Sequence, residues 1–210
     1  MNLSVILFFL HNVLATVLLG GKFVSKRDSV IKNFGIALLL DGVAFAAWTF
    51  GILSPTNLLS AVTIGAIFFL VSLVFMFRAS TESTGMRWSL TILGIVVALG
   101  IFYFGHIATE TAYISPEGLV FFNLGPMVQM LYIFGLMLAS LPAIEAIASK
   151  FKSWYAALFR YGFIIQIAGA IMLITSKDSQ ALYIVGWIIG LSYFLLWTTL
   201  LFSKKAWSTN

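Results

Sequence analysis

The chain has 210 residues, of which 61% are hydrophobic and only 9% are charged, and its mean hydropathy is +1.05. Ordinary soluble domains are about half apolar and a quarter charged, so this composition excludes a soluble globular protein and favours a helical bundle in lipid. The net charge of +5 comes from Lys and Arg near predicted helix ends, where they set membrane orientation rather than bind nucleic acid. No cysteine is present, which excludes disulfides and thiolate-ligated metals.

Apolar runs long enough to cross the ~30 Å hydrocarbon core recur seven times. They predict an all-α, polytopic membrane bundle that forms a single domain over residues 1–210. The first run is interpreted as a retained helix because its first positive charge, Lys22, follows it, whereas a signal peptide carries positive charge before its apolar run. The seven predicted helices cover residues 2–24, 34–53, 58–77, 90–109, 119–149, 155–176 and 181–203.

The fifth predicted helix is longer than a straight span needs. Pro142 is expected to kink or end it, because proline removes a helical hydrogen bond and clashes with the preceding turn. Pro126 is expected to bend the helix near Gln129. This bend either shapes a binding site or is a tolerated feature of a membrane helix.

The distribution of basic residues predicts the orientation. With the N-terminus outside, eleven of the twelve Lys and Arg fall on the inner side, and only Lys177 falls outside. Basic residues collect on the cytoplasmic side of membrane proteins, so the N-terminus is predicted outside and the C-terminus in the cytoplasm. The expected location is a plasma membrane or an inner membrane.

The first three and last three predicted helices run in the same directions across the membrane, with the fourth between them. Gly35 and Gly42 in the second helix parallel Gly162 and Gly169 in the sixth. Many transporters are built from duplicated bundles, so a weak 3+1+3 repeat is one interpretation. Chance is the other, because glycine is common in membrane helices.

The carboxyl group of Asp41 lies in an apolar run, and an ionisable group at membrane depth is a functional-site hypothesis by default. Counting ~1.5 Å per residue places polar side chains of four other predicted helices at similar depth. They are His11, Gln129, Gln166 and Tyr193. Because polar groups avoid lipid, we expect this layer to bind a small molecule or an ion. The alternative is that Asp41 only joins two helices by a hydrogen bond.

Two further pairs lie near the predicted helix ends. His106 and Glu110 are four residues apart and share a helix face if the fourth helix reaches Glu110. They then line an outer mouth, but two ligands are too few for a zinc site, and no metal is predicted. Glu145 and Arg160 are expected to form an inner ion pair that either braces the adjacent connection or gates it.

The sequence lacks the residues that several classes of cofactor and enzyme require. Retinal would need a lysine in the middle of the last helix, which has none before Lys204, and two histidines cannot hold two haems. No phosphate-binding glycine loop, Gly-x-Ser-x-Gly turn or His-Glu-x-x-His helix occurs. The sequence therefore predicts no enzyme activity and no cofactor.

Three functions remain open. The first is a transporter of a small solute or ion, with the polar layer around Asp41 as its site. The second is a seven-helix sensor or receptor that contacts a signalling partner, and the third is a structural or assembly subunit of a larger membrane complex. The expected partners are the lipid bilayer, a small ligand, and a second protein or another copy of the chain, without nucleic acid.

Overall fold

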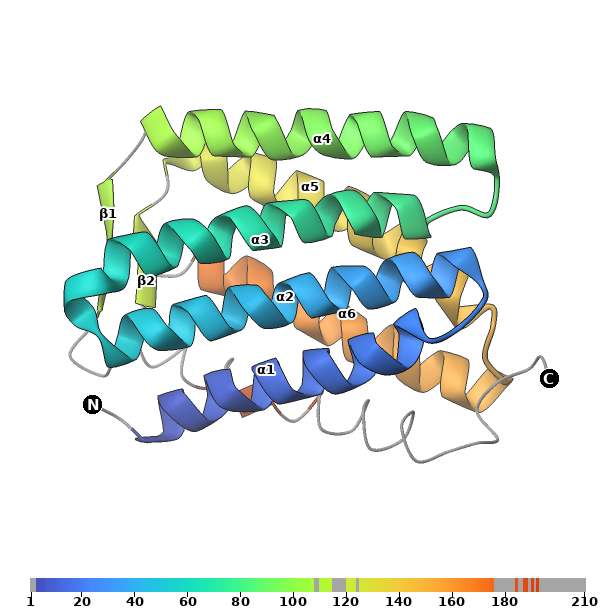
Figure 1. Ribbon diagram of the computed structural model, residues 1–210, viewed down its shortest axis with the longest axis horizontal. Helices are drawn as coiled ribbons and strands as arrows, with labels where there is room; N and C mark the ends of the chain where they lie inside the picture. The colour runs from blue at the N-terminus through green and yellow to red at the C-terminus, as the bar shows by residue number, and fades with distance from the viewer. Residues whose placement is uncertain are drawn as a thin grey trace.

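The computed structural model describes residues 3–107, 110–114, 120–123 and 125–175, together with residues 184, 187, 188, 190 and 192. This part of the chain forms six long helices, one short 3-10 helix and a two-stranded hairpin (Figure 1). Most of the predicted seventh span, 181–203, lies outside the described residues. In chain order the elements are α1 (Leu3–Val24), α2 (Ser29–Leu53), η1 (Pro55–Asn57), α3 (Leu58–Ala79), α4 (Thr84–Ile107), β1 (Glu110–Ile114), β2 (Val120–Asn123), α5 (Pro126–Ala148) and α6 (Ser153–Thr175).

The architecture is helical as predicted, but the prediction of one helix over 119–149 is wrong at its beginning, where a short hairpin lies. Residues Val120–Asn123 form β2, which pairs antiparallel with β1. The helix α5 begins only at Pro126, whose fixed φ suits a first helical position and whose missing N–H costs nothing there. Pro126 therefore starts the helix instead of bending it. Pro142 lies inside α5, which continues to Ala148.

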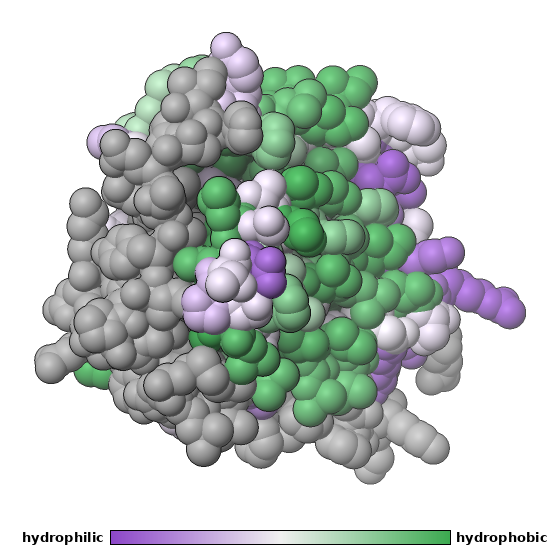
Figure 2. Space-filling model, turned by 60° about the vertical axis from the view of Figure 1, so that its left-hand side comes forward, coloured by the Kyte–Doolittle hydropathy of each residue, from purple (hydrophilic) through white to green (hydrophobic). Residues whose placement is uncertain are grey.

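Four of the described helical segments are long and apolar enough to cross a membrane. They are Ser29–Leu53, Pro55–Ala79, Thr84–Phe104 and Pro126–Ala148. The surface of α4 carries a continuous apolar stripe, because Ile92, Val96, Leu99 and Tyr103 recur at helical spacing and are each more than 60% exposed. Figure 2 shows a broad apolar surface over its right half, with a small polar patch near the centre of the view and strongly hydrophilic residues at the right-hand edge. These features make the chain compatible with a membrane protein.

Successive helices run in opposite directions, and α3 packs against α2, α4 and α5 (Figure 1). As a result the three connections after α1, α3 and α5 lie at the same end of the bundle, which we call the charged end. The nine described Lys and Arg residues lie at this end or within about two turns of it. They are Lys22, Lys26, Arg27, Lys32, Arg78, Arg87, Lys150, Lys152 and Arg160.

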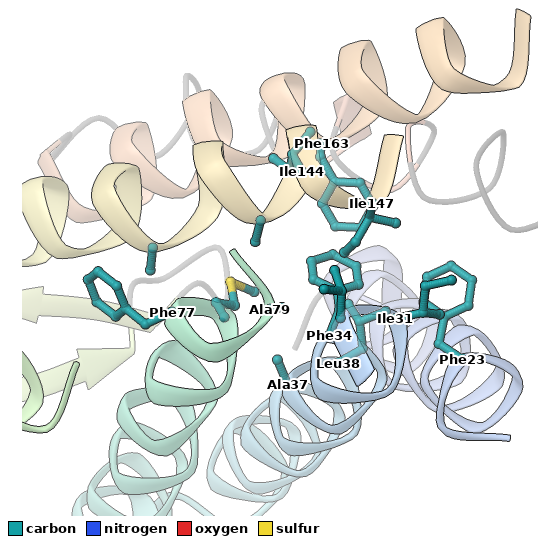
Figure 3. Packing of buried hydrophobic residues seen from close by; sticks show 14 of the residues in the cluster. Phe23, Ile31, Phe34, Ala37, Leu38, Phe77, Ala79, Ile144, Ile147 and Phe163 are labelled. Atoms are coloured by element: carbon teal, nitrogen blue, oxygen red, sulfur yellow. The ribbon is translucent and has the colours of Figure 1, made fainter. Parts of the chain in front are cut away.

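An aromatic cluster fills the core near the charged end (Figure 3). The ring of Phe34 on α2 lies 6.1 Å from that of Phe23 on α1, and 5.8 and 5.2 Å from those of Phe159 and Phe163 on α6. Phe23, Phe34 and Phe159 are completely buried. These rings therefore join α1, α2 and α6, which are far apart in sequence.

Two glycines allow α1 and α2 to approach closely beside this cluster. A Cβ atom on Gly35 would lie 2.6 Å from the Val24 nitrogen and 2.9 Å from the Gly20 carbonyl oxygen. A Cβ on Gly20 would in turn lie 2.8 Å from the Gly35 carbonyl oxygen. Small residues at such crossings let helix backbones pack directly against each other.

Candidate functional site

The carboxyl group of Asp41 lies at the centre of a membrane-length helix and is buried. Asp41 is twelve residues from each end of α2 and only 6% exposed. Its Oδ1 lies 2.5 Å from the hydroxyl oxygen of Ser72 on α3, which is itself completely buried. Among the described residues, no Lys or Arg contacts this carboxyl group. Asp41 and Ser72 are the central pair of the candidate site.

Helix α1 brings further polar groups to the side of α2 next to Asp41. A Cβ on Gly42, the next residue after Asp41, would lie only 2.9 Å from Thr16 Oγ1. The Thr16 hydroxyl donates to the Asn12 carbonyl oxygen over 2.7 Å, and both residues are completely buried. The region around Asp41 therefore draws buried polar side chains from three helices, α1, α2 and α3.

The other members of the predicted polar layer are more scattered. His11 on α1 places its Nε2 3.1 Å from the Gly190 carbonyl oxygen, and no hydrogen bond joins it to Asp41. Gln166 on α6 is 8% exposed, and its side-chain nitrogen has no hydrogen-bond partner among the described residues. His11 thus links α1 to Gly190, and the Gln166 amide is a buried polar group on α6.

Gln129 does not share the central position of Asp41 within its helix. Since α5 begins at Pro126, Gln129 lies in its first turn, where its backbone N–H donates to the Gly125 carbonyl oxygen over 3.0 Å. The expected depth depended on a helix starting at residue 119. Tyr193, the remaining member of the layer, lies outside the described residues.

The two peripheral pairs have different outcomes. The helix α4 ends at Ile107, so His106 is in its last turn while Glu110 begins β1, and they do not share a helix. The expected contact between Glu145 and Arg160 is present, because Arg160 Nε lies 2.9 and 3.0 Å from the two carboxylate oxygens. Both side chains are exposed. Whether this pair braces or gates the connection stays a prediction.

Ser72 is the site residue that the sequence analysis missed. A signal for it exists, because α2 and α3 are joined by the short turn η1 and run antiparallel. Asp41 lies twelve residues before the end of α2, and Ser72 lies fourteen residues after the start of α3. Counting outward from the turn therefore places the hydroxyl opposite the carboxyl group.

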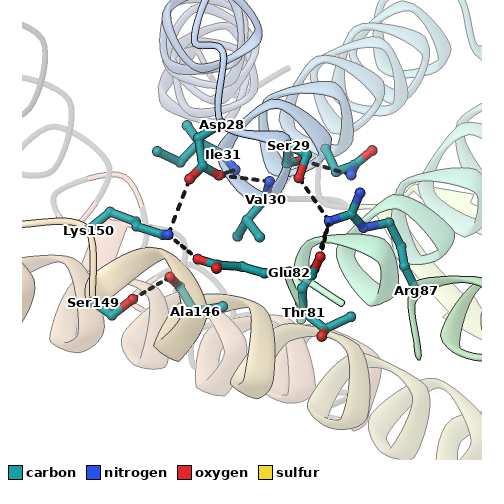
Figure 4. A network of polar contacts seen from close by, with 11 residues as sticks. Asp28, Ser29, Val30, Ile31, Thr81, Glu82, Arg87, Ala146, Ser149 and Lys150 are labelled. Atoms are coloured by element: carbon teal, nitrogen blue, oxygen red, sulfur yellow. Dashed lines mark hydrogen bonds and ion pairs between the residues drawn. The ribbon is translucent and has the colours of Figure 1, made fainter. Parts of the chain in front are cut away.

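A second polar cluster joins the three connections at the charged end (Figure 4). The Lys150 ammonium, after α5, lies 3.2 Å from Asp28 Oδ2 before α2 and also pairs with Glu82 before α4. Arg87 Nη2 donates to the Ser29 hydroxyl over 2.8 Å and to the Glu82 carbonyl oxygen over 3.1 Å. These contacts hold the charged end together, and the sequence analysis did not foresee them.

Asp28 has a double role at this end. Its Oδ1 accepts hydrogen bonds from the Val30 and Ile31 N–H groups, which caps α2. Partial burial opposes its ionisation, but the Ile31 and Val30 N–H groups and the Lys150 ammonium outweigh burial and lower the pKa of Asp28. The hydrogen bond to Glu82 raises the pKa of Lys150. Partial burial opposes this rise, and the contact with Asp28 adds to it.

The stability contributed by this cluster should depend on pH in opposite senses for its two groups. The lowered pKa of Asp28 means that its contribution is complete above about pH 4, its unfolded value, and is lost as the pH falls through its folded value. The raised pKa of Lys150 means that its contribution is complete below about pH 10 and is lost as the pH rises through its folded value.

We expect Asp28→Ala to lower the free energy of unfolding by about 1–2 kcal/mol near neutral pH, because both the cap and the ion pair are lost. Asp28→Asn is the matched control, since its amide oxygen can still cap α2 and only the charge is removed, at a cost of about 0.5 kcal/mol. Unfolding in mixed detergent, followed by circular dichroism, measures both. Equal losses for the two variants would show that the cap contributes nothing.

Comparisons with protein-family models, with curated proteins and with solved structures give no significant match to this chain. Among the described residues, no three His, Asp or Glu side chains gather to form a metal site. The geometry around Asp41 is therefore the basis on which a function is assigned.

Proposed function

We propose that the chain is an integral membrane transporter of a small solute or ion, with its site at Asp41 and Ser72. The observation that carries the proposal is a carboxyl group buried at the centre of a membrane-length helix without a basic partner among the described residues. Such a group is costly at membrane depth and marks ion and substrate pathways. Buried Asn12 and Thr16 from α1 and Gln166 from α6 supply further polar groups inside the bundle.

The proposed topology has seven spans, with the N-terminus outside and the charged end in the cytoplasm. The nine described Lys and Arg residues at that end support this orientation. Trp88 and Trp154, at the starts of α4 and α6, are 62% and 69% exposed there. Exposed tryptophans are favoured at the membrane–water interface, so they support the same placement.

Uptake into proteoliposomes tests the proposal. The probes are labelled amino acids, sugars and monovalent cations, each driven inward by its own gradient. We expect the purified protein to take up at least one of them faster than protein-free vesicles do. Asp41→Asn should reduce that uptake about tenfold or more, which corresponds to a loss of roughly 1.4 kcal/mol of interaction.

Thr49→Val is the matched control for this assay. Thr49 is also polar, buried and on α2, but among the described residues its hydroxyl donates to the Phe45 carbonyl oxygen of its own helix alone, over 2.7 Å. Uptake by the Thr49→Val protein should stay within about a factor of two of the wild-type rate, because the substituted side chain does not contact the ligand. Equal uptake by Asp41→Asn and the wild-type protein would remove Asp41 from the transport mechanism.

A further inference from the structure

The hydroxyl group of Ser72 has one hydrogen atom and two acceptors within reach. Its oxygen lies 2.5 Å from Asp41 Oδ1 and 2.8 Å from the Phe69 carbonyl oxygen on its own helix. A serine hydroxyl supplies one O–H donor and two acceptor lone pairs. A hydrogen shared between two acceptors leaves one contact longer, as at Thr16, whose hydroxyl oxygen lies 2.7 Å from the Asn12 carbonyl oxygen and 3.1 Å from that of Val13. Both Ser72 contacts are short, and a second hydrogen on the carboxyl group accounts for them.

Other hydroxyl groups in the described helices show where the Ser72 hydrogen goes. Thr16 donates to the Asn12 carbonyl oxygen over 2.7 Å, Thr49 to that of Phe45 over 2.7 Å, and Thr91 to that of Arg87 over 2.6 Å. Each donates to the carbonyl four residues earlier, a common arrangement for hydroxyls within helices. Ser72 can donate to the Phe69 carbonyl oxygen, three residues earlier, as Ser149 does to that of Ala146 over 2.7 Å, which leaves its lone pairs facing Asp41.

The surroundings of Asp41 offer no compensating charge. On the helices that contact α2, the described titratable groups away from the charged end are His11 on α1, Tyr132 on α5 and Tyr161 on α6, and Tyr161 is 69% exposed. Tyr155 and Arg160 of α6 belong to the charged end. His11 lies against the Gly190 carbonyl oxygen, and the Tyr132 ring packs on that of Phe69 at 6.1 Å. Lys22, Arg78 and Glu145 belong to the charged end. An uncompensated charge in such a place is far more costly than a neutral carboxylic acid.

We propose that Asp41 carries a proton in this state and donates it to Ser72 Oγ, and that this proton is the ion the site exchanges. The inference rests on the proposed transport function and names its ion. A bound metal cation would draw on several oxygen ligands at once, whereas here one carboxyl oxygen and one hydroxyl face each other. The hydrogen-bonded chain runs from Asp41 through Ser72 to the Phe69 carbonyl oxygen.

Release of the proton breaks one covalent bond and redirects the hydrogen bond that Ser72 donates. The O–H bond of the Asp41 carboxylic acid breaks, the proton leaves to water on the side to which the site is open, and a carboxylate remains. The Ser72 hydrogen can then rotate from the Phe69 carbonyl oxygen to the carboxylate and offset part of its charge. Reprotonation of Asp41 reverses the rotation, so Ser72 serves both protonation states.

Infrared spectroscopy tests the protonation directly. The chain contains only three aspartates, Asp28, Asp41 and Asp178, so carbon-13 labelling of aspartate identifies their bands in the wild-type protein. At neutral pH we expect a label-sensitive carbonyl band of a protonated carboxylic acid, which Asp41→Asn removes and Ser72→Ala shifts to higher frequency because the acceptor is lost. A wild-type spectrum without that band overturns the proposal, and so does a band that Ser72→Ala leaves unchanged.

Proton movement tests the second part. In vesicles that contain a pH-sensitive dye, with potassium and valinomycin to clamp the voltage, an external acid pulse should acidify the interior about tenfold faster with wild-type protein than with Asp41→Asn. The carboxylic acid band without this proton flux overturns the proton as the exchanged ion. Solute uptake without the band would refute the proton and leave the transport function standing, whereas the band with neither proton flux nor uptake of any probe would refute transport itself.

Discussion

Phe34→Ala should lower the free energy of unfolding by about 3 kcal/mol. The ring is completely buried and contacts the rings of Phe23, Phe159 and Phe163, so its removal leaves a cavity between α1, α2 and α6. The value is at the lower end of the range for buried phenylalanine, because lipid or detergent also solvates an exposed ring. Unfolding in mixed detergent, followed by circular dichroism, measures the loss.

Phe50→Ala is the control for this experiment, since it removes the same side chain from the same helix at a position that is 56% exposed. Its cost should stay below about 1 kcal/mol, because no cavity forms. Similar losses for the two variants would contradict the close packing of α6 against α1 and α2. A larger loss of unfolding free energy in Phe50→Ala would mean that the Phe50 ring packs against a part of the protein outside the described residues.

Gly35→Ala should destabilise the protein by about 1–3 kcal/mol, because the added Cβ meets backbone atoms that cannot rotate away. The new atom would lie 2.6 Å from the Val24 nitrogen and 2.9 Å from the Gly20 carbonyl oxygen. The two helices must therefore separate, which also loosens Phe34 and Phe23 beside the crossing. Gly35→Leu should prevent the two helices from packing and abolish folded protein in a size-exclusion profile.

Gly21→Ala provides the comparison on α1. A Cβ at Gly21 would meet no atom within 4 Å, and alanine is the better helix former by about 1 kcal/mol. This variant should be as stable as wild type or more so. If Gly21→Ala destabilised the protein as much as Gly35→Ala does, loss of helix flexibility would explain both effects and the close crossing would not.

Much of the helical framework was predictable from the periodic apolar runs, because membrane-length helices leave a strong signal in composition. The sequence also identified Asp41, since a carboxyl group in an apolar run is conspicuous. The start of α5 was missed because Val120–Asn123 is apolar and continues the run, although its β-branched and aromatic residues suit a strand. Pro126, interpreted as a bend, was the signal for a helix start.

The contacts that could not be predicted from the sequence join segments that are far apart in the chain. The pairing of His11 with Gly190 joins residues 179 positions apart, and the pairing of Lys150 with Glu82 joins residues 68 apart. Nothing local in the sequence specifies either contact, because charged residues in surface connections can pair in many ways. Ser72 differs, since its distance from a short turn was readable beforehand.

A transport site at Asp41 requires that water reaches the buried pair of Asp41 and Ser72. The chain has no cysteine, so Ser72→Cys carries a single thiol of nearly the same size as the hydroxyl. Its rate of reaction with a small, water-soluble methanethiosulfonate in sealed membranes is the direct measurement, with Leu73→Cys as the control, because Leu73 is equally buried on the same helix. We predict that Ser72→Cys reacts at least about tenfold faster than Leu73→Cys, since the ionised thiol that reacts needs water. Equal lack of reaction at both positions would contradict a transport site at Asp41.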